Sequence, residues 1–256
     1  MDTAGNAWDL TGRKALVTGA SRGIGEAAAI RLARAGADLV IASRKPEQLE
    51  TVAKKCRDLG RQCWVQPANV SSAEDIDRLA KAAVDRLGGL DILVNNAGTN
   101  PVMGPVLMAD ERGWDKTMGV NVKGPLLLCK ALHPALAKSG RASVVNVASI
   151  AGLRPATMLG IYSVTKAALI MLTKVLATEW GGASIRVNAI APGIIKTEMS
   201  RAIWQNEALL KQAMAGQAIR RIGLPEEIAE MVLFLASDAS AFTTGTVMVA
   251  DGGETA

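Results

Sequence analysis

The chain has 256 residues, of which 49% are hydrophobic, and a formal net charge of +5 at pH 7. This length suffices for a large core. No apolar run reaches the roughly 18–20 residues that span a bilayer, and the first ten residues lack the pattern of a secretory signal. We therefore expect a cytoplasmic protein with no membrane partner. The three cysteines show no Cys-x-x-Cys spacing, which supports neither a disulfide framework nor a zinc site.

Histidine is nearly absent, since His133 is the only one. This argues against a Ser-His-Asp hydrolase and against a multi-histidine metal site, so we expect no metal. The basic residues are scattered singly and are not clustered with aromatic side chains, which argues against a nucleic acid as partner. General acid–base chemistry at neutral pH must therefore fall to another residue type.

The first elements predict a nucleotide site. Residues 14–18 form a short apolar run typical of a strand, and residues 26–36 are typical of a helix that ends at Gly36. A glycine-rich turn joins them, with the spacing Gly-x3-Gly-x-Gly. Such a turn lets a pyrophosphate approach the backbone and the helix N-terminus, although it can also simply connect two elements. The cofactor-binding candidates here are Gly19, Ser21, Arg22, Gly23, Ile24 and Gly25.

The end of the second predicted strand, residues 37–42, indicates which dinucleotide binds. An acidic residue there would hold the ribose 2′-hydroxyl of NAD. This chain instead has Ser43 and Arg44, followed by Lys45. A hydroxyl and a guanidinium can hydrogen-bond a 2′-phosphate, which favours NADP(H). The alternative is that the basic residues only solvate a loop.

Strands and helices alternate along the rest of the chain. We predict strands at 62–66, 90–94, 143–149, 184–190 and 246–250, and helices at 46–59, 71–87, 162–180 and 225–235. Ser71 is the expected N-cap of the second of these helices. The alternation predicts an α/β fold of one domain over residues 1–256, a doubly wound parallel sheet of about seven strands with helices on both faces. Ligands then bind beyond the carboxyl ends of the strands.

A candidate catalytic group surrounds Tyr162, the only tyrosine of the chain. Lys166 follows four residues later on the same helical face, and Ser149 stands at the end of an apolar strand. A nearby ammonium favours the phenolate, so we expect Lys166 to lower the tyrosine pKa toward neutrality. A tyrosine with such a pKa can act as a general acid or base. Taken alone, the pair could also be an ordinary surface pair.

Two further segments have expected roles. The helix at 162–180 is apolar around much of its circumference. The sheet can cover only one side of it, so the remaining apolar side predicts a subunit interface. Residues 194–221 have a looser pattern that suits a mobile flap over the substrate pocket, although a plain pair of surface helices fits as well.

Taken in order, these motifs resemble the classical short-chain dehydrogenase/reductase family. The resemblance covers nearly the whole chain and is carried by Thr18 to Gly25, Asn95 to Gly98, Asn121, Ser149, Tyr162-x3-Lys166 and Pro192-Gly193-x3-Thr197. It implies a Rossmann-type fold, hydride transfer between NADP(H) and a carbonyl or alcohol carbon, and a homotetramer. Further cofactor contacts are implied at Asn69, Val70, Asn95, Ala97, Gly98, Tyr162, Lys166, Pro192, Gly193, Ile195 and Thr197.

The resemblance also implies catalytic roles. Tyr162 would donate or accept the proton, and Ser149 would hydrogen-bond the reacting oxygen. Lys166 would lower the tyrosine pKa and hold the nicotinamide ribose. Asn121 would position a water that links Lys166 to solvent.

Two positions depart from the pattern. Many relatives have an aspartate where this chain has Asn69, whose amide can still contact adenine. The chain looks most similar to 3-oxoacyl-(acyl-carrier-protein) reductases and carbonyl reductases, but Thr178 stands where carrier-protein reductases tend to have a basic residue. We therefore expect a carbonyl reductase, with the carrier-protein reductase as the alternative. A non-catalytic NADP-binding protein is disfavoured, because a binder has no use for the Asn-Ser-Tyr-Lys set.

The expected substrate pocket is mostly apolar, which favours an apolar or extended carbonyl compound over a small charged sugar acid. Its candidate residues are Ile150, Leu153, Met158, Leu159, Met199, Ile203 and Trp204.

Overall fold

The computed structural model of the chain describes residues 6–256. Its centre is one parallel sheet with the strand order β3-β2-β1-β4-β5-β6-β7, which confirms the predicted fold. The strands are β1 (Lys14–Thr18), β2 (Asp38–Ser43), β3 (Cys63–Pro67), β4 (Ile92–Asn95), β5 (Ala142–Val147), β6 (Ile185–Pro192) and β7 (Val247–Ala250). The order reverses between β1 and β4, and a crevice at such a reversal is where doubly wound sheets bind ligands.

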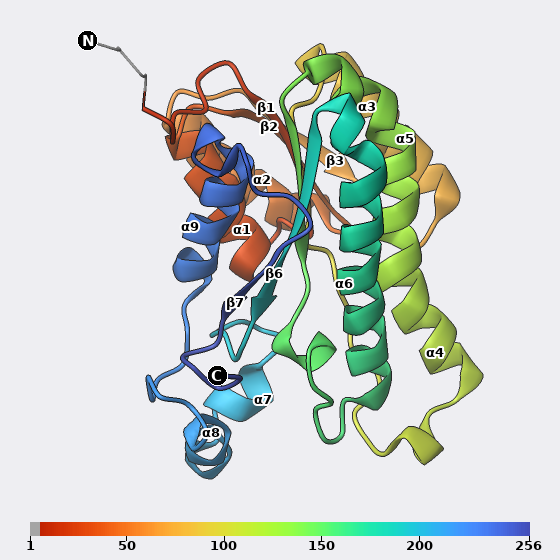
Figure 1. The fold of residues 1–256 in the computed structure, drawn as a ribbon, viewed down its shortest axis with the longest axis vertical. Coiled ribbons are helices and arrows are strands. Elements are labelled where there is room, and N and C mark those ends of the chain that lie inside the picture. The colour runs from red at the N-terminus through yellow and green to blue at the C-terminus, as the bar shows by residue number, and fades with distance from the viewer. Residues whose placement is uncertain (1–5) are drawn as a thin grey trace.

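Helices cover both faces of the sheet (Figure 1). One core cluster joins the sheet to α1 (Gly23–Arg34), α2 (Pro46–Asp58) and α9 (Pro225–Ala236). A second cluster joins it to α3 (Ala73–Leu87), α5 (Gly124–Ser139) and α6 (Gly160–Trp180). Every residue of β4 and β5 is buried, as expected for strands with helices on both sides.

Shorter helices lie near the carboxyl ends of the strands (Figure 1). They are α4 (Glu111–Met118), α7 (Arg201–Trp204) and α8 (Glu207–Met214). Helices α7 and α8 fall within the segment 194–221 that we expected to be a flap. Between α4 and α5, residues Gly119–Lys123 form a wider π-helical turn that includes Asn121. Such turns occur frequently at functional sites.

Two predicted boundaries are displaced. The N-cap of α3 is Ser72, whose hydroxyl accepts from the Asp75 amide, and Ser71 instead turns its hydroxyl to Asn69 Oδ1 at 2.9 Å. Strand β5 ends at Val147, two residues before Ser149, so that Ser149 caps a 3-10 turn at Ile150–Gly152. The first difference arises because the adjacent Ser71 and Ser72 can each form local hydrogen bonds, and the second because Ser149 Oγ accepts from the Ala151 amide at 3.1 Å and so begins a turn.

From the sequence we expected no segment long and apolar enough to span a membrane, but one helix passes that test. The helical stretch Gly160–Ala183 is long and apolar enough to cross a membrane by length and composition. Half of its most apolar window is buried inside the domain, against the sheet and its neighbouring helices. A core helix passes the same test, so the finding is weak evidence for a membrane span.

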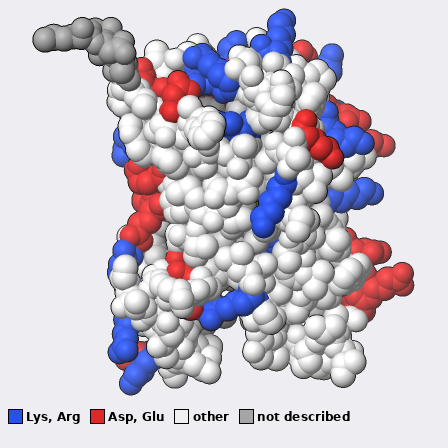
Figure 2. Space-filling view, viewed as in Figure 1, with Lys and Arg blue, Asp and Glu red and all other residues white. Residues whose placement is uncertain are grey.

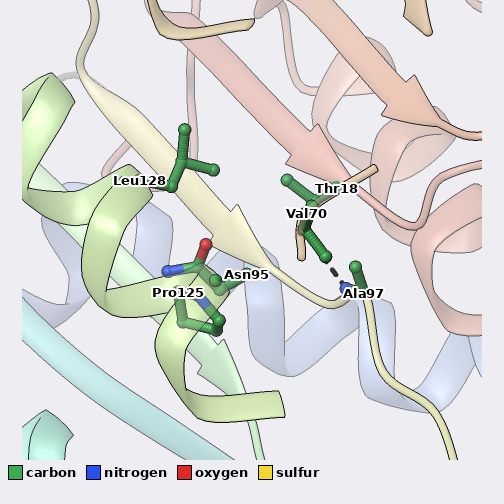
Figure 3. Close-up of a pocket in the computed structure, with 7 residues that line it drawn as sticks. Thr18, Val70, Asn95, Ala97, Pro125 and Leu128 are labelled. Atoms are coloured by element: carbon green, nitrogen blue, oxygen red, sulfur yellow. Dashed lines mark hydrogen bonds between the residues drawn. The ribbon is translucent and has the colours of Figure 1, made fainter. Parts of the chain in front are cut away.

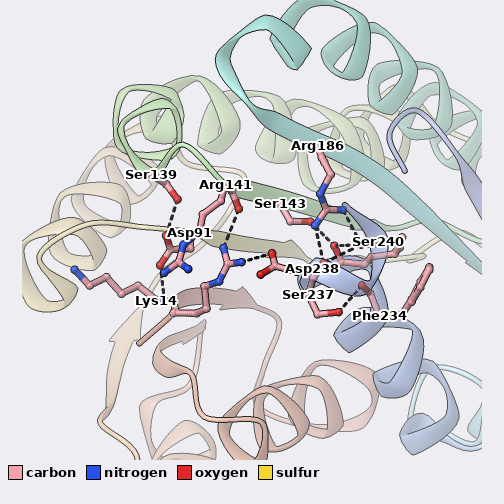
Figure 4. A network of polar contacts seen from close by, with 12 residues as sticks. Lys14, Asp91, Ser139, Arg141, Ser143, Arg186, Phe234, Ser237, Asp238 and Ser240 are labelled. Atoms are coloured by element: carbon pink, nitrogen blue, oxygen red, sulfur yellow. Dashed lines mark hydrogen bonds and ion pairs between the residues drawn. The ribbon is translucent and has the colours of Figure 1, made fainter. Parts of the chain in front are cut away.

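A polar network closes the sheet at the amino ends of the strands, opposite the predicted site (Figure 4). The buried guanidinium of Arg13 donates to Arg141 O at 3.0 Å and pairs with Asp238. Asp91 accepts from the Lys14 amide at 2.9 Å. These contacts join the starts of β1, β4 and β5, and therefore serve stability.

Replacing Arg13 with alanine is expected to lower the free energy of unfolding by about 1–3 kcal/mol, because Arg141 O loses its charged donor. Asp238 is largely exposed and is rehydrated, which limits the loss. Urea denaturation measures the effect. Lys54→Ala is the matched control, since it removes only an exposed ion pair with Asp58, worth about 0–1 kcal/mol. Equal midpoints for the two variants would contradict a stabilising role for Arg13.

Candidate active site

The glycine-rich turn after β1 is built for close backbone approach. Gly19 has φ +65°, and a Cβ there would lie 2.8 Å from the Ala97 Cα. A Cβ on Gly25 would collide with the Gly19 carbonyl. The Asn96 amide fastens this turn by donating to Thr18 O at 3.0 Å and Gly19 O at 3.1 Å. The three glycines thus let the turn pack closely on its neighbours and give α1 an N-terminus with no Cβ at Gly23 and Gly25, which fits a pyrophosphate-binding turn.

The end of β2 fits a 2′-phosphate. Ser43 Oγ is buried and has no hydrogen-bond partner within the described chain, although buried hydroxyls normally have one. Arg22 and Arg44 are exposed nearby, one in the glycine turn and one directly after the strand. A hydroxyl without a partner in the described residues, together with these two exposed arginines, matches the donor set that a phosphate monoester requires.

A small pocket, too tight to admit a water molecule, lies between the ends of β1 and β4 and the start of α5 (Figure 3). In Figure 3, Thr18 and Ala97 face each other across it, joined by a 3.2 Å hydrogen bond from the Ala97 amide to Thr18 Oγ1. Its lining residues are Thr18, Val70, Asn95, Ala97, Gly124, Pro125 and Leu128. Three predicted cofactor residues, Val70, Asn95 and Ala97, therefore meet here.

Two of the predicted amides are already engaged. Asn95 is buried, and its Nδ2 donates to Asn146 Oδ1 at 2.9 Å, so its side-chain amide is held by the core. The Asn69 Oδ1 accepts from the backbone and hydroxyl of Ser71. An adenine contact at position 69 is therefore left to the Asn69 Nδ2 or to the backbone.

The catalytic candidates come together at the carboxyl ends of β4 and β5. Lys166 is buried, and its ammonium donates to Val147 O at 2.7 Å and lies 5.5 Å from the centroid of the Tyr162 ring. The Ser149 hydroxyl lies beside the Tyr162 phenol, where it lowers the pKa of the phenol. The 3-10 turn that Ser149 caps packs tightly on α6, since a Cβ on Gly152 would lie 2.6 Å from the Lys166 carbonyl carbon.

The ionisation of the pair differs from our expectation. Burial raises the pKa of Tyr162 to about 12, and the nearby Ser149 hydroxyl only partly offsets this. Burial also lowers the pKa of Lys166, to about 8. The predicted shift of the tyrosine pKa toward neutrality is therefore wrong for this arrangement, because the effect of burial is larger than any effect of the nearby ammonium. The spacing placed the ammonium near the ring, but it could not reveal how strongly the fold desolvates both groups.

Asn121 supports the site through its side chain. Its Oδ1 accepts from the Thr99 amide at 2.9 Å, and its Nδ2 donates to Thr99 O and to Thr165 Oγ1, both at 3.0 Å. The amide thereby joins the segment after β4 to α6. Both amide hydrogens of Asn121 are used by these contacts, whereas Oδ1 accepts one hydrogen bond and has a second lone pair that a water could use, as the family resemblance implies.

The segment after β6 lies close to the glycine turn. A Cβ on Gly23 would be 3.2 Å from Thr197 Cγ2, and one on Gly193 would be 2.8 Å from the Asp251 Cα. Ile195 is buried, and Pro192 is the last residue of β6. Trp204 Nε1 donates to Thr197 O at 2.8 Å and so attaches α7 to this segment. The start of the expected flap is therefore anchored beside the predicted cofactor residues.

Several apolar residues near this end of the molecule were missed by the sequence reasoning. Gly104 N donates to Met158 O at 2.9 Å, which brings the loop before α4 against the loop before α6. The exposed apolar side chains of the first loop are Met103, Val106, Leu107 and Met108. The signal was present as an unusually apolar loop sequence. Of the predicted pocket residues, Leu153, Met158 and Met199 are also exposed.

Comparisons with known proteins agree with this geometry. A sequence profile described as Enoyl-(Acyl carrier protein) reductase matches residues 19–255. Dehydrogenase/reductase SDR family member 4 is 43% identical in Oryctolagus cuniculus, over 95% of this chain and 94% of that protein. The human protein of the same name is 42% identical over 95% of this chain and 88% of its own length.

Solved structures give the same result. A short-chain type dehydrogenase/reductase from Mycobacterium ulcerans superposes with a TM-score of 0.93 at 32% identity, covering 96% of this chain and 90% of that one. A gluconate 5-dehydrogenase from Burkholderia cenocepacia, solved in complex with NADP and tartrate, superposes with a TM-score of 0.92 at 32% identity, covering 97% of both chains.

Proposed function

The chain belongs to the short-chain dehydrogenase/reductase family of NAD(P)(H)-dependent oxidoreductases, and we propose that it is an NADP(H)-dependent carbonyl reductase. The observation that carries the proposal is the meeting of Tyr162, Lys166 and Ser149 beside the glycine turn. When bound, NADPH supplies the hydride that reduces the carbonyl carbon. The protein must then hold the ketone and deliver one proton to its oxygen.

The residues of the chain divide this work. Tyr162 is a neutral phenol at pH 7, because its pKa is raised, so its Oη carries the proton that the developing alkoxide needs. The hydroxyl of Ser149, which lies beside the phenol, would donate a second hydrogen bond to the substrate oxygen. Lys166 places a positive charge near the phenol and favours the phenolate that forms. Asn121 holds the segments that carry these groups.

Turnover of a small panel tests this function. NADPH consumption would be followed with an aryl ketone, an α-diketone, a 3-oxoacyl thioester and a keto-sugar, with NADH run in parallel. We expect turnover of the free ketones with NADPH. Preferential turnover of the thioester would favour a 3-oxoacyl-(acyl-carrier-protein) reductase, the second candidate, which the family profile keeps open. Preference for the keto-sugar would favour an activity like that of the gluconate 5-dehydrogenase neighbour.

Arg44 is expected to set the cofactor preference. Replacing Arg44 with aspartate removes a guanidinium beside the Ser43 hydroxyl and adds a charge that repels the 2′-phosphate. We expect kcat/KM with NADPH to fall by about tenfold to hundredfold, and kcat/KM with NADH to remain or rise. Arg112→Asp on the exposed surface of α4 makes the same charge change as a control. Equal losses with both cofactors would contradict phosphate recognition.

We further propose a homotetramer. Helix α6 leaves Val164, Met171 and Val175 exposed on the side away from the sheet, where a second subunit would cover them. Figure 2 shows that uncharged side chains dominate the face that includes α6, with charged side chains scattered over it and toward its edges. Light scattering of the purified protein would measure the subunit number, and a monomer would contradict this part of the proposal.

A further inference from the structure

Arg154 lies directly after the short 3-10 turn that Ser149 caps. Ser149 caps the 3-10 turn, and the Arg154 amide donates to Ile150 O at 3.1 Å, so Arg154 continues directly from that turn. After Arg154, the loop that leads to α6 is held by hydrogen bonds to other segments. Two of them are the Ala156 amide to Ser163 Oγ at 3.3 Å and Met158 O to Gly104. The Arg154 side chain adds a further contact to this loop, which reaches a different segment of the chain.

The Arg154 side chain forms an ion pair with Glu254 of the C-terminal segment. Arg154 Nη2 donates to Glu254 Oε1 at 2.5 Å, across a sequence separation of 100 residues. The Glu254 side chain is only 16% exposed, whereas that of Arg154 is 49% exposed. The carboxylate thus comes from a fixed position, and the guanidinium reaches over to it.

The segment that carries Glu254 contacts both Gly193 and the end of the segment 194–221. Within the segment, Asp251 Oδ2 accepts from the Thr255 amide and hydroxyl at 2.8 and 2.7 Å, which fixes its conformation. Asp251 packs against Gly193, one of the predicted cofactor residues. The Ile219 amide donates to Gly252 O at 2.8 Å. The end of the segment 194–221 is therefore bound to the same C-terminal segment, residues 251–255, which we call the C-terminal strap.

We infer that Arg154 and Glu254 are positioning residues for the carbonyl substrate, because their ion pair joins the Ser149 loop to the C-terminal strap that also holds the end of the 194–221 segment. This inference rests on the proposed reductase function. The pair touches neither Tyr162 nor Lys166, and it acts by fixing the loop that starts at Ser149. Small displacements of positioned groups reduce rates strongly, whereas a half-exposed ion pair adds little stability.

The experiment compares Arg154→Gln, Glu254→Gln and the charge-swapped double variant Arg154→Glu/Glu254→Arg. Glu230→Gln is the matched control, since it removes one ion pair between segments far apart in sequence, Arg31 to Glu230 at 2.6 Å. For each protein, KM and kcat for the ketone, the Kd of NADPH and the KM at rising salt would be measured. Hydrogen exchange over residues 150–158 and 216–221 gives a readout that needs no turnover.

We expect both single variants to raise the KM for the ketone about two- to fivefold, the factor that an exposed ion pair commonly represents, with an unchanged Kd for NADPH. The charge swap should recover part of the loss. The KM of the wild type should rise with salt, while that of Glu254→Gln should not, because screening acts on the pair. Exchange should accelerate in both segments in Glu254→Gln but not in Glu230→Gln.

Unchanged KM and unchanged exchange in both single variants would overturn the inference. So would a charge swap that recovers nothing, or a loss that falls equally on NADPH binding. A wild-type protein that turns over no ketone would overturn the proposed function instead, and the exchange data would still decide whether the ion pair holds the two segments.

Discussion

Replacing Tyr162 with phenylalanine is expected to slow reduction severely while leaving the fold and cofactor binding intact. The variant removes one oxygen atom from a partly buried ring that otherwise keeps its packing. The lost group is the only tyrosine hydroxyl of the chain, and the sole histidine, His133, lies beside Trp180 at a ring-centroid distance of 4.7 Å. We expect kcat to fall by about a hundredfold to ten-thousandfold, the range that general acid catalysis contributes.

The binding of NADPH, measured by its fluorescence, separates loss of chemistry from loss of structure in this variant. The Kd should change by less than about twofold, because phenylalanine keeps the ring that faces Lys166. Ser149→Ala is the companion variant, which removes the hydroxyl beside Tyr162 and should lower kcat by a smaller factor. If Tyr162→Phe kept most of the wild-type turnover, another group would have to be the proton donor.

The overall architecture follows from local patterns in the sequence. Short apolar runs at β1, β4 and β5 are buried on both faces, and the glycine turn between β1 and α1 needs conformations and close contacts that only glycine permits. These features act within a few residues of one another, so the spacing of residue types is enough to predict them.

The hydrogen-bond partners within the site were not predictable in the same way. Asn95 donates to Asn146 across 51 residues, and Asn121 donates to Thr165 across 44 residues. Motif spacing placed both amides at the site but could not show that their side chains are engaged by the core. The pKa of Tyr162 was misjudged for a related reason, because desolvation depends on every segment that packs around the phenol.

The pH dependence of the reaction is expected to report on Lys166. Its buried ammonium has a pKa lowered to about 8, so the positive charge is present below that pH and is lost above it. Tyr162, with a pKa raised to about 12, remains protonated throughout this range and does not limit reduction. The kcat/KM for ketone reduction should therefore decline as the pH rises through about 8. Oxidation of the alcohol needs the phenolate as base and should instead rise toward alkaline pH.

Two substitutions of Lys166 separate its charge from its titration. Lys166→Met keeps much of the volume but leaves Val147 O without its donor, and we expect kcat/KM to fall by about a hundredfold or more. Lys166→Arg keeps a charge that does not titrate below pH 12, so its residual activity should show no inflection near pH 8. With NADPH saturating, the profile of kcat/KM for the ketone describes the complex with NADPH, so the inflection near pH 8 is sought in that complex. An unchanged inflection in Lys166→Arg would assign the pH dependence to a different group, and the ammonium would then act only by holding Val147 and the ring of Tyr162 in place.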